Sequence, residues 1–559
     1  MKNISTILQN KNITIILNVI LIFLAGLIIF KNSLFYTDEL VLQSDIKQCD
    51  LKGYNNIDGE FIPNKESDTV EIALKNVYSE GNKVILDLNN KLKEDATISL
   101  NYTCDGNNKK TIATKSVRMG KSQVVFVFDN RYFETMEIEI KSLDKTHYIS
   151  FSDGTVNICH RGLNIFQNNS RYFLKLFLIF ICAVVISLLI QFLGRKNKVD
   201  YRKRERDSNI ELLRIICMIA IVLHHCVVHG GAVNMNACNN KVLAFFFLPI
   251  GKICFVTFIA ISMWFLVDGS FNFRRFLNTW CLVLFYSVIL TFICFCVGKP
   301  ISIKQFASSF LPIAGNSHGF AAAYLLFYLI YPFVHLLMDQ LSKKNARIIL
   351  ALAFYAQIGS QIIGNYNGYT QDFSSEIGLF IFCFILSYNL KKWPMTFEED
   401  KKFNLLIFIT VWVGVVQANL MAYVWNNSTE VSEWILRLSQ NESALLMILG
   451  GYALFFCFKN IKLKNNRLIN SLASYTFGVL LIHDHNFFRS YFWEDIVILN
   501  EWYYSKYFIL ILLLKGLAIF YVCCVIEYIR KQIIKKQIWN SKIGEKIKER
   551  VFEVDATGK

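Results

Sequence analysis

The stretch SNIELLRIICMIAIVLHHCVVHGG, at residues 208–231, decides the fold of this chain. Its apolar residues do not form one amphipathic stripe, and they run for about 20 residues, the length that a helix needs to cross a bilayer. Nine further blocks of this kind follow it, which predicts an all-α polytopic membrane core of ten helices. The ten blocks lie near residues 209–229, 242–267, 276–298, 319–338, 346–364, 376–389, 403–424, 441–459, 468–484 and 506–529.

The composition also points to a membrane protein. Of the 559 residues, 54% are hydrophobic and only 18% are charged, and the mean hydropathy is +0.36. Soluble domains usually carry about 25% charged residues. The net charge of +16 would suit a nucleic-acid partner, but no soluble segment carries a basic stripe with interleaved aromatic residues. We therefore expect the lipid bilayer as a partner and no nucleic acid.

Two more apolar blocks, 13–30 and 172–193, precede the core. The first follows Lys2 and Lys11 and lacks a clear small-residue cleavage site, so an uncleaved anchor is favoured over a signal peptide. The predicted domains are an N-terminal transmembrane anchor (1–31), a β-rich domain (32–170), a second transmembrane helix (171–195), a basic linker (196–208), the ten-helix domain (209–530) and a basic tail (531–559).

The segment between the first two apolar blocks has a different pattern. Stretches such as NKVILDLNN, ATISLNYTC and SQVVFVFDN alternate apolar and polar residues and are separated by Gly, Asn and Asp. Alternation of this kind is typical of half-buried strands, and several short strands in a row indicate a small antiparallel domain. We expect a sandwich-like β-domain flanked by the two extra transmembrane helices.

The distribution of charge predicts the topology. Residues 31–170 hold 17 Lys and Arg against 20 Asp and Glu, so the positive excess lies elsewhere. It is concentrated in GRKNKVDYRKRERD at 194–207 and in every second connection of the core, such as SKKNAR and KNIKLKNNR. Positive loops face the cytoplasm. The sequence therefore predicts a cell-membrane protein with both termini in the cytoplasm and the β-domain outside.

The 15 cysteines do not form a disulfide framework, because twelve lie in or beside apolar blocks, where Cys behaves as a small hydrophobe. Only Cys49, Cys104 and Cys159 lie in the β-rich segment, so at most one bridge can form there. No Cys or His spacing matches a metal site, and no metal is expected.

Ionisable residues inside a span are costly and are candidates for function. The first core helix contains Glu211, Arg214, His224 and His225. Arg214 and His225 are eleven residues apart, which places them on one face and about 16 Å apart along the axis. Glu211 can pair with Arg214 on that face. The alternative is that Glu211 and Arg214 only reach the membrane edge while the histidines belong to the opposite interface.

Three more residues are candidates. His483, in SYTFGVLLIHDHNFF, lies at about the same depth as His225 if both helices start at the basic edge, so the two imidazoles could share a cavity. Its alternative role is an edge histidine satisfied by Asp484. Arg274 and Arg275, in DGSFNFRRF, could hold a phosphate-bearing donor or simply set topology. Histidine titrates near neutral pH and suits general acid or base catalysis.

The blocks SNIELLRIICMIAIVLHHCVVHGG, GKICFVTFIAISMWFLVDGSFNFRRF, FLPIAGNSHGFAAAYLLF and TFGVLLIHDHNFFRSYFW resemble, in order, those of membrane acyltransferase family 3. The resemblance covers roughly residues 205–535. Members of that family are bacterial integral-membrane proteins that O-acylate, most often O-acetylate, cell-surface polysaccharides.

The resemblance implies roles for individual residues. The Arg-x10-His spacing assigns His225 as the catalytic residue, as a base or as an acyl acceptor, with Arg214 as its partner. It also implies acetyl-CoA as the donor, with Arg274 and Arg275 near its phosphates, although relatives often have Arg-x-x-Arg there. His224 is the adjacent alternative to His225. Two further departures, Met263 after Ser262 and Gly319 with Phe320 after His318, fall where the acceptor would bind.

Other functions compete with acyl transfer. A transporter or flippase of a glycan or lipid-linked intermediate would also use many spans with buried charges. A sensor is disfavoured, because the predicted cytoplasmic tail is only about 30 residues long. The sequence leaves open whether the β-domain guides the acceptor or is a spacer.

Overall fold

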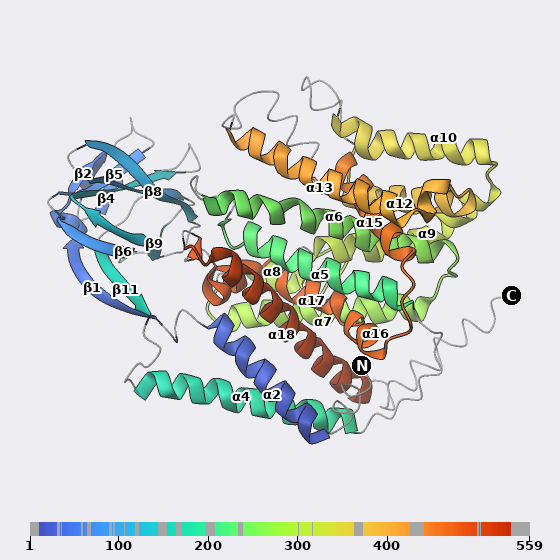
Figure 1. The fold of residues 1–559 in the computed structure, drawn as a ribbon, viewed down its shortest axis with the longest axis horizontal. Coiled ribbons are helices and arrows are strands. Elements are labelled where there is room, and N and C mark those ends of the chain that lie inside the picture. The colour runs from blue at the N-terminus through green and yellow to red at the C-terminus, as the bar shows by residue number, and fades with distance from the viewer. Residues whose placement is uncertain are drawn as a thin grey trace.

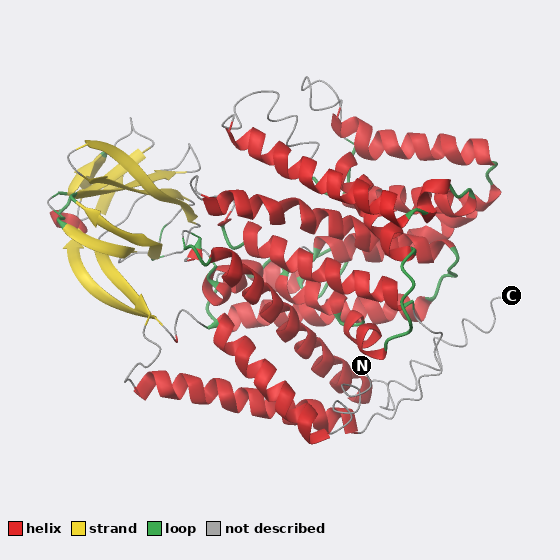
Figure 2. Cartoon of the chain, viewed as in Figure 1, coloured by secondary structure: helices red, strands yellow, loops and turns green. Residues whose placement is uncertain are grey.

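The computed structural model describes residues 11–30, 34, 36–57, 60–63, 69–75, 77–88, 92, 96–104, 107–117, 122–142, 154–163, 170–195, 207–232, 239–299, 301–315, 317–362, 373–424, 441–499, 502–503 and 505–537. Figure 2 shows the strands gathered at one end of the molecule and the helices filling the rest. The chain thus has a β-rich N-terminal region and a helical C-terminal region, as predicted.

Two helices lie on either side of the β-rich region in the sequence. They are α2 (Lys11–Ile29) and α4 (Ser170–Arg195). The two helices lie side by side against α18 (Phe508–Gln537) (Figure 1). The rings of Phe23 and Phe180 meet edge to face at 5.9 Å, and Gly26 allows a close approach to Ile179. These helices therefore form a pair that is attached to the last helix of the chain.

The β-rich region contains two larger sheets and a hairpin, and all its strand pairs are antiparallel. One sheet has the order β1-β11-β6-β9, the second β2-β5-β10-β7-β8, and β3 pairs with β4. The strands are β1 (Tyr36–Asp45), β2 (Asp50–Lys52), β3 (Tyr54–Ile57), β4 (Glu60–Pro63), β5 (Thr69–Leu74), β6 (Ser79–Leu88), β7 (Ala96–Cys104), β8 (Asn107–Val117), β9 (Gln123–Phe133), β10 (Thr135–Ser142) and β11 (Gly154–Leu163), with a short 3-10 turn η1 (Ile46–Gln48) after β1.

The two larger sheets bury their apolar faces against each other. Leu86 of β6 and Phe126 of β9 in the first sheet share one core with Ile98 of β7 and Ile138 of β10 in the second, and all four side chains are fully buried. Alternate residues of each strand point into this core, as the period of two requires. The prediction of an antiparallel β-region is confirmed.

The described cysteines of the β-rich region are free thiols. Cys49 is half-buried and Cys159 is buried, while the side chain of Cys104 lies outside the described residues. Burial and the neighbouring Asp45 and Asp50 carboxylates raise the pKa of Cys49 to about 11. This thiol is therefore protonated at neutral pH.

The helical region contains a helix in each predicted block, and three blocks differ in detail. The block at 346–364 is α10 followed by a π-helical turn. The block at 468–484 is broken at Ser474 into two short helices, and α18 continues to Gln537, inside the predicted tail. The elements are α5 (Ser208–Val228), α6 (Asn239–Val267), α7 (Phe273–Cys296), α8 (Ile303–Ser308), α9 (Gly319–Gln340), α10 (Lys343–Phe354), η3 (Tyr355–Gly359), α12 (Glu376–Lys392), η4 (Thr396–Glu399), α13 (Lys401–Val424), α15 (Leu445–Lys459), α16 (Arg467–Ala473), α17 (Thr476–His483), η5 (Tyr491–Val497) and α18.

Seven of the described helices are long and apolar enough to cross a membrane: α4, α5, α6, α7, α9, α13 and α18. This agrees with a multi-pass membrane protein. Helix α5 is the most buried of the seven and α4 the least, so α5 is the central helix of the region. The predicted basic linker lies almost entirely outside the described residues.

An aromatic contact joins the β-rich region to the helical region. Tyr36, at the start of β1, meets Trp502 edge to face at 4.9 Å. The guanidinium of Arg161 on β11 lies 5.1 Å from the Tyr36 ring centroid. Trp502 belongs to the segment before α18, and a Cβ on Gly230, just after α5, would lie 3.4 Å from Leu499 in the same segment. The β-rich region therefore sits at the end of the helical region where α5 ends.

Candidate active site

Two histidines from different helices form a hydrogen bond at the C-terminal end of α5. His483 is the last residue of α17, and its Nε2 lies 3.0 Å from Nδ1 of His225. His225 is 13% exposed at its side chain, whereas His483 is fully buried. The sequence predicts that the two imidazoles lie at the same depth in the membrane. The structure brings them together, although the helical segment that leads to His483 is broken.

The hydrogen bonds assign the proton positions on both rings. Nδ1 of His483 lies 2.6 Å from the carbonyl oxygen of Val479. A carbonyl can only accept, so this Nδ1 carries the proton and Nε2 of the neutral ring is an acceptor. Nδ1 of His225 must then donate to His483. Consequently a neutral His225 presents Nε2 with a free lone pair, and this atom has no hydrogen-bonding partner among the described residues.

A carboxylate lies beside this pair. Oδ1 of Asp484 is 4.0 Å from Nδ1 of His225 and 3.8 Å from Nε2 of His229. Nη1 of Arg489 lies 3.3 Å from the same oxygen. The sequence predicts Asp484 only as a partner of His483. It gives no signal for Arg489, because no local pattern predicts that the chain after Asp484 turns back towards the end of α17.

His225, His229 and Asp484 offer three ligand atoms within 4.8 Å of one another, a spacing that a metal ion can use. Two imidazoles and a carboxylate are common ligands of divalent transition metals. However, Asp484 is already paired with Arg489, and Nδ1 of His225 is committed to His483. Two of the three groups therefore already have partners within the protein, and the expectation of no metal stays a prediction.

His224 points away from this pair. It is 6% exposed, and its Nδ1 has no partner within the described part of the chain. A Cβ on Gly251 of α6 would lie 2.2 Å from Cβ of His224, so only glycine fits there. His224 therefore packs against α6.

The arginine candidates gather elsewhere along α5. Nη1 of Arg214 lies 3.3 Å from Oε1 of the buried Glu211, the predicted pair. Arg275 has its guanidinium 5.9 Å from the ring centroid of Tyr328. Tyr324, one turn earlier on α9, lies within electrostatic reach of both Arg275 and Arg214. The two arginines thus approach the same tyrosine. Arg274 and Arg275 are both exposed at the start of α7.

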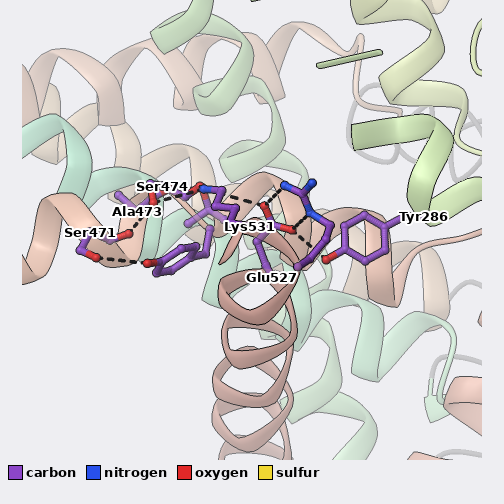
Figure 3. A network of polar contacts seen from close by, with 9 residues as sticks. Tyr286, Ser471, Ala473, Ser474, Glu527 and Lys531 are labelled. Carbon is purple, nitrogen blue, oxygen red and sulfur yellow. Dashed lines mark hydrogen bonds and ion pairs between the residues drawn. The ribbon is translucent and has the colours of Figure 1, made fainter. Parts of the chain in front are cut away.

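A second polar cluster, which the sequence did not single out, lies at the other end of α17 (Figure 3). Glu527 of α18 is 1% exposed and pairs with Arg530 through bonds of 2.7 and 2.8 Å. Tyr286 of α7 donates to Glu527 at 2.8 Å, and Lys531 lies 3.8 Å from it while bonding to Ser474. A Cβ on Gly478 would lie 2.6 Å from Glu527. An acidic residue followed at i+3 and i+4 by two bases in an apolar helix was the available signal.

One comparison with known proteins identifies a family. A family model described as an acyltransferase domain matches residues 207–528, which is more than half of the chain and spans α5 through most of α18. No curated protein matches the sequence. The matched residues include the His225–His483 pair, the arginines near Tyr324, and Glu527 with Tyr286.

Proposed function

Because this chain belongs to acyltransferase family 3, we propose that it transfers an acyl group, in the simplest case acetyl, from a cytoplasmic acyl-CoA to a hydroxyl of an extracytoplasmic glycan or cell-surface polysaccharide. The observation that carries the proposal is the hydrogen bond between His225 and His483, which leaves Nε2 of His225 free. A general base needs such a lone pair.

The donor side of the proposal rests on Arg214 and Arg275. Guanidinium groups bind phosphate well, and both lie near Tyr324. Arg214 and His225 are separated by about 16 Å along α5. A donor with its phosphates at the arginines and an extended arm along α5 would bring its thioester to His225. Arg274 is adjacent to Arg275 and equally exposed, so it would meet the donor phosphates from the same helix start.

The chemical step uses Nε2 of His225. It takes the proton of the acceptor hydroxyl while the oxygen attacks the thioester carbonyl, and the proton then passes to the sulfur as the carbon–sulfur bond breaks. In the second candidate mechanism, Nε2 itself attacks, forms an acyl-imidazole and releases CoA before the hydroxyl attacks. Both mechanisms need the tautomer that His483 holds.

A transport function is the main alternative. Transporters often use helices interrupted by Pro or Gly, and here Pro249 lies inside α6 and Pro332 inside α9. Acyl transfer is favoured by the family match and by the oriented imidazole, which transport does not require.

The test is to incubate membranes containing the chain with labelled acetyl-CoA and a cell-surface glycan. Acyl transfer predicts label in the glycan that is lost on mild alkaline hydrolysis, as an ester is. Movement of glycan across the membrane with no label incorporated would contradict the proposal and favour transport.

A further inference from the structure

Several polar side chains that no catalytic step uses follow one another around the end of the helical region where His225 lies. The first contact runs from α5 to α6. His224 packs on Gly251, and the next residue, Lys252, lies within electrostatic reach of His224. Nζ of Lys252 is 3.8 Å from Oε1 of Glu442, just before α15. This series of polar contacts thus begins on α5 beside the catalytic histidine and reaches the start of α15.

The series continues over the first turns of α12 and α9. Glu376, the first residue of α12, lies within electrostatic reach of Glu442. A Cβ on Gly319, the first residue of α9, would lie 3.2 and 3.3 Å from the two carboxylate oxygens of Glu376. Gly319 thus leaves room for this carboxylate. Within the described residues, Glu376 is exposed and has no hydrogen bond or ion pair.

His318 connects this series of polar side chains to the catalytic pair. This residue precedes α9, is 6% exposed, and its Nε2 has no partner in the described part of the chain. Its ring meets the ring of His485 edge to face at 4.8 Å. His485 is two residues after His483, which bonds to His225. Neighbouring Ser317 and Ser287 are buried, and their hydroxyls are likewise unpaired among described residues.

An aromatic layer lies beneath these side chains. Phe255 of α6 and Phe320 of α9 have their ring centroids 4.7 Å apart, and Phe320 is 5.4 Å from Phe380 of α12. Each aromatic residue is two to four residues further along the chain than the polar residue before it. On α9 and α12 the polar residues therefore lie at the start of the helix, and the aromatic side chains close the space between the helices beyond them. We call the following set the polar ring: His224, Lys252, Glu442, Glu376, His318 and His225.

From this arrangement we infer that the polar ring is the acceptor subsite of the proposed acyltransferase, and that the Glu376 carboxylate and Nε2 of His318 bind hydroxyl groups of a glycan. The inference rests on the proposed function and names the residues that select its acceptor. A buried polar atom without a partner costs about 1 to 3 kcal/mol. Such groups are retained where a ligand satisfies them.

The chemistry of the ring fits a polyhydroxylated ligand. A free carboxylate accepts hydrogen bonds from hydroxyls, Lys252 donates to them, and an imidazole or serine hydroxyl can do either. The ring contains both charge signs in close proximity, so it has no strong preference for an ionic ligand. It lies at the end of the helices that faces the β-rich region, where an extracytoplasmic acceptor would arrive.

The test is acetyl transfer from labelled acetyl-CoA by the purified full-length chain to a panel of methyl glycosides, of which the best wild-type acceptor is used. Glu376→Gln keeps the shape of the side chain and removes the charge. We expect the KM for the glycoside to rise about tenfold, because a charged hydrogen bond is lost, while the KM for acetyl-CoA stays unchanged. His318→Phe keeps an aromatic ring and removes the nitrogen atoms, so it should raise the same KM.

Glu399→Gln is the matched control, because Glu399 is an exposed glutamate in η4, beyond the opposite end of α12. It should leave both KM values unchanged. If the wild type is active and the glycoside KM is unchanged in both the Glu376 and the His318 variants, the inference is overturned while the proposed function stands. A wild type that acetylates no glycoside and no surface glycan would overturn the proposed function and the inference with it. An unchanged acetyl-CoA KM shows that the variants are folded.

Discussion

The two ends of α17 carry polar clusters of opposite kind. At its C-terminal end, His225 and His483 share one hydrogen bond, and Nε2 of His225 has no protein partner among the described residues. At its other end, Glu527 is fully engaged by Arg530, Lys531 and Tyr286. A buried polar group whose partners are all supplied by the protein holds helices together. A buried polar group that is held in one orientation but keeps an unpaired atom is suited to catalysis. The two ends of α17 thus have different roles, one in catalysis and the other in stability.

The largest expected effect is on activity at the histidine end. His225→Ala removes the free Nε2, and we expect acyl transfer to fall by about 10³-fold or more, with the thermal midpoint in detergent nearly unchanged. The readout is label transferred from acetyl-CoA to glycan, alongside the melting curve. Wild-type activity in this variant would remove His225 from the site. His160→Ala, at an exposed histidine of β11, is the comparison variant and should retain transfer.

The opposite end should respond in the opposite way. Glu527→Ala leaves the Arg530 guanidinium and the Tyr286 hydroxyl buried without their acceptor, which costs about 3 to 5 kcal/mol. We expect a large drop in thermal midpoint and in the yield of folded protein. Any molecule that folds should retain its KM values. If the stability is unchanged and only catalysis is lost, the division between the two ends is wrong.

A smaller effect is expected for the residue that orients the base. His483→Ala frees Nδ1 of His225, so the tautomer with Nε2 unprotonated is no longer selected, and kcat should fall about 10²-fold with both KM values retained. His483→Gln places an amide oxygen near the same Nδ1 and should recover part of kcat. The pH profile of kcat should shift in both variants. Equal losses in the Ala and Gln variants with no change in the pH profile would indicate packing and not orientation.

The smallest effect tests the geometry of the charged end. Arg530→Lys keeps the charge but replaces the two-bond fork on Glu527 with a single donor. We expect a loss of about 1 kcal/mol in stability and unchanged transfer. Melting curves for this variant and for Glu527→Ala, measured side by side, should rank in that order. The reverse ranking would show that the fork, and not the buried carboxylate, holds the cluster.

The sequence predicted the parts of the structure that depend on local pattern. Helix blocks follow from runs of apolar residues, and the strands from alternation. The pairing of Glu211 with Arg214 follows from helix geometry alone. The meeting of His225 and His483 was accessible because both helices could be measured from a basic edge. The break at Ser474 reduces the length of continuous helix before His483. No Pro or Gly at that position predicts the break.

The rest of the site depends on tertiary contacts. Glu376 begins one helix and His318 precedes another, and each is unremarkable in its own segment. Only the approach of α12 to α9 places the Glu376 carboxylate against Gly319, the residue after His318. Lys252 and Glu442 are almost 200 residues apart in sequence and have no shared periodicity. The Glu527 cluster could have been suspected from its spacing, but its partner Tyr286 could not.

The attachment of the β-rich region has a consequence for how freely it can turn. The region is joined to the chain through α2 and α4, which pack together on α18, and Tyr36 presses on Trp502 beside the same helix. A helix before and after the region in the sequence, together with a packed aromatic contact, restricts how far the region can turn. Anything bound to one of its faces would therefore be held at a nearly constant distance and angle from the polar ring. Such a ligand would therefore have a high effective concentration at the polar ring, and this concentration would be set by the geometry of the attachment and not by diffusion.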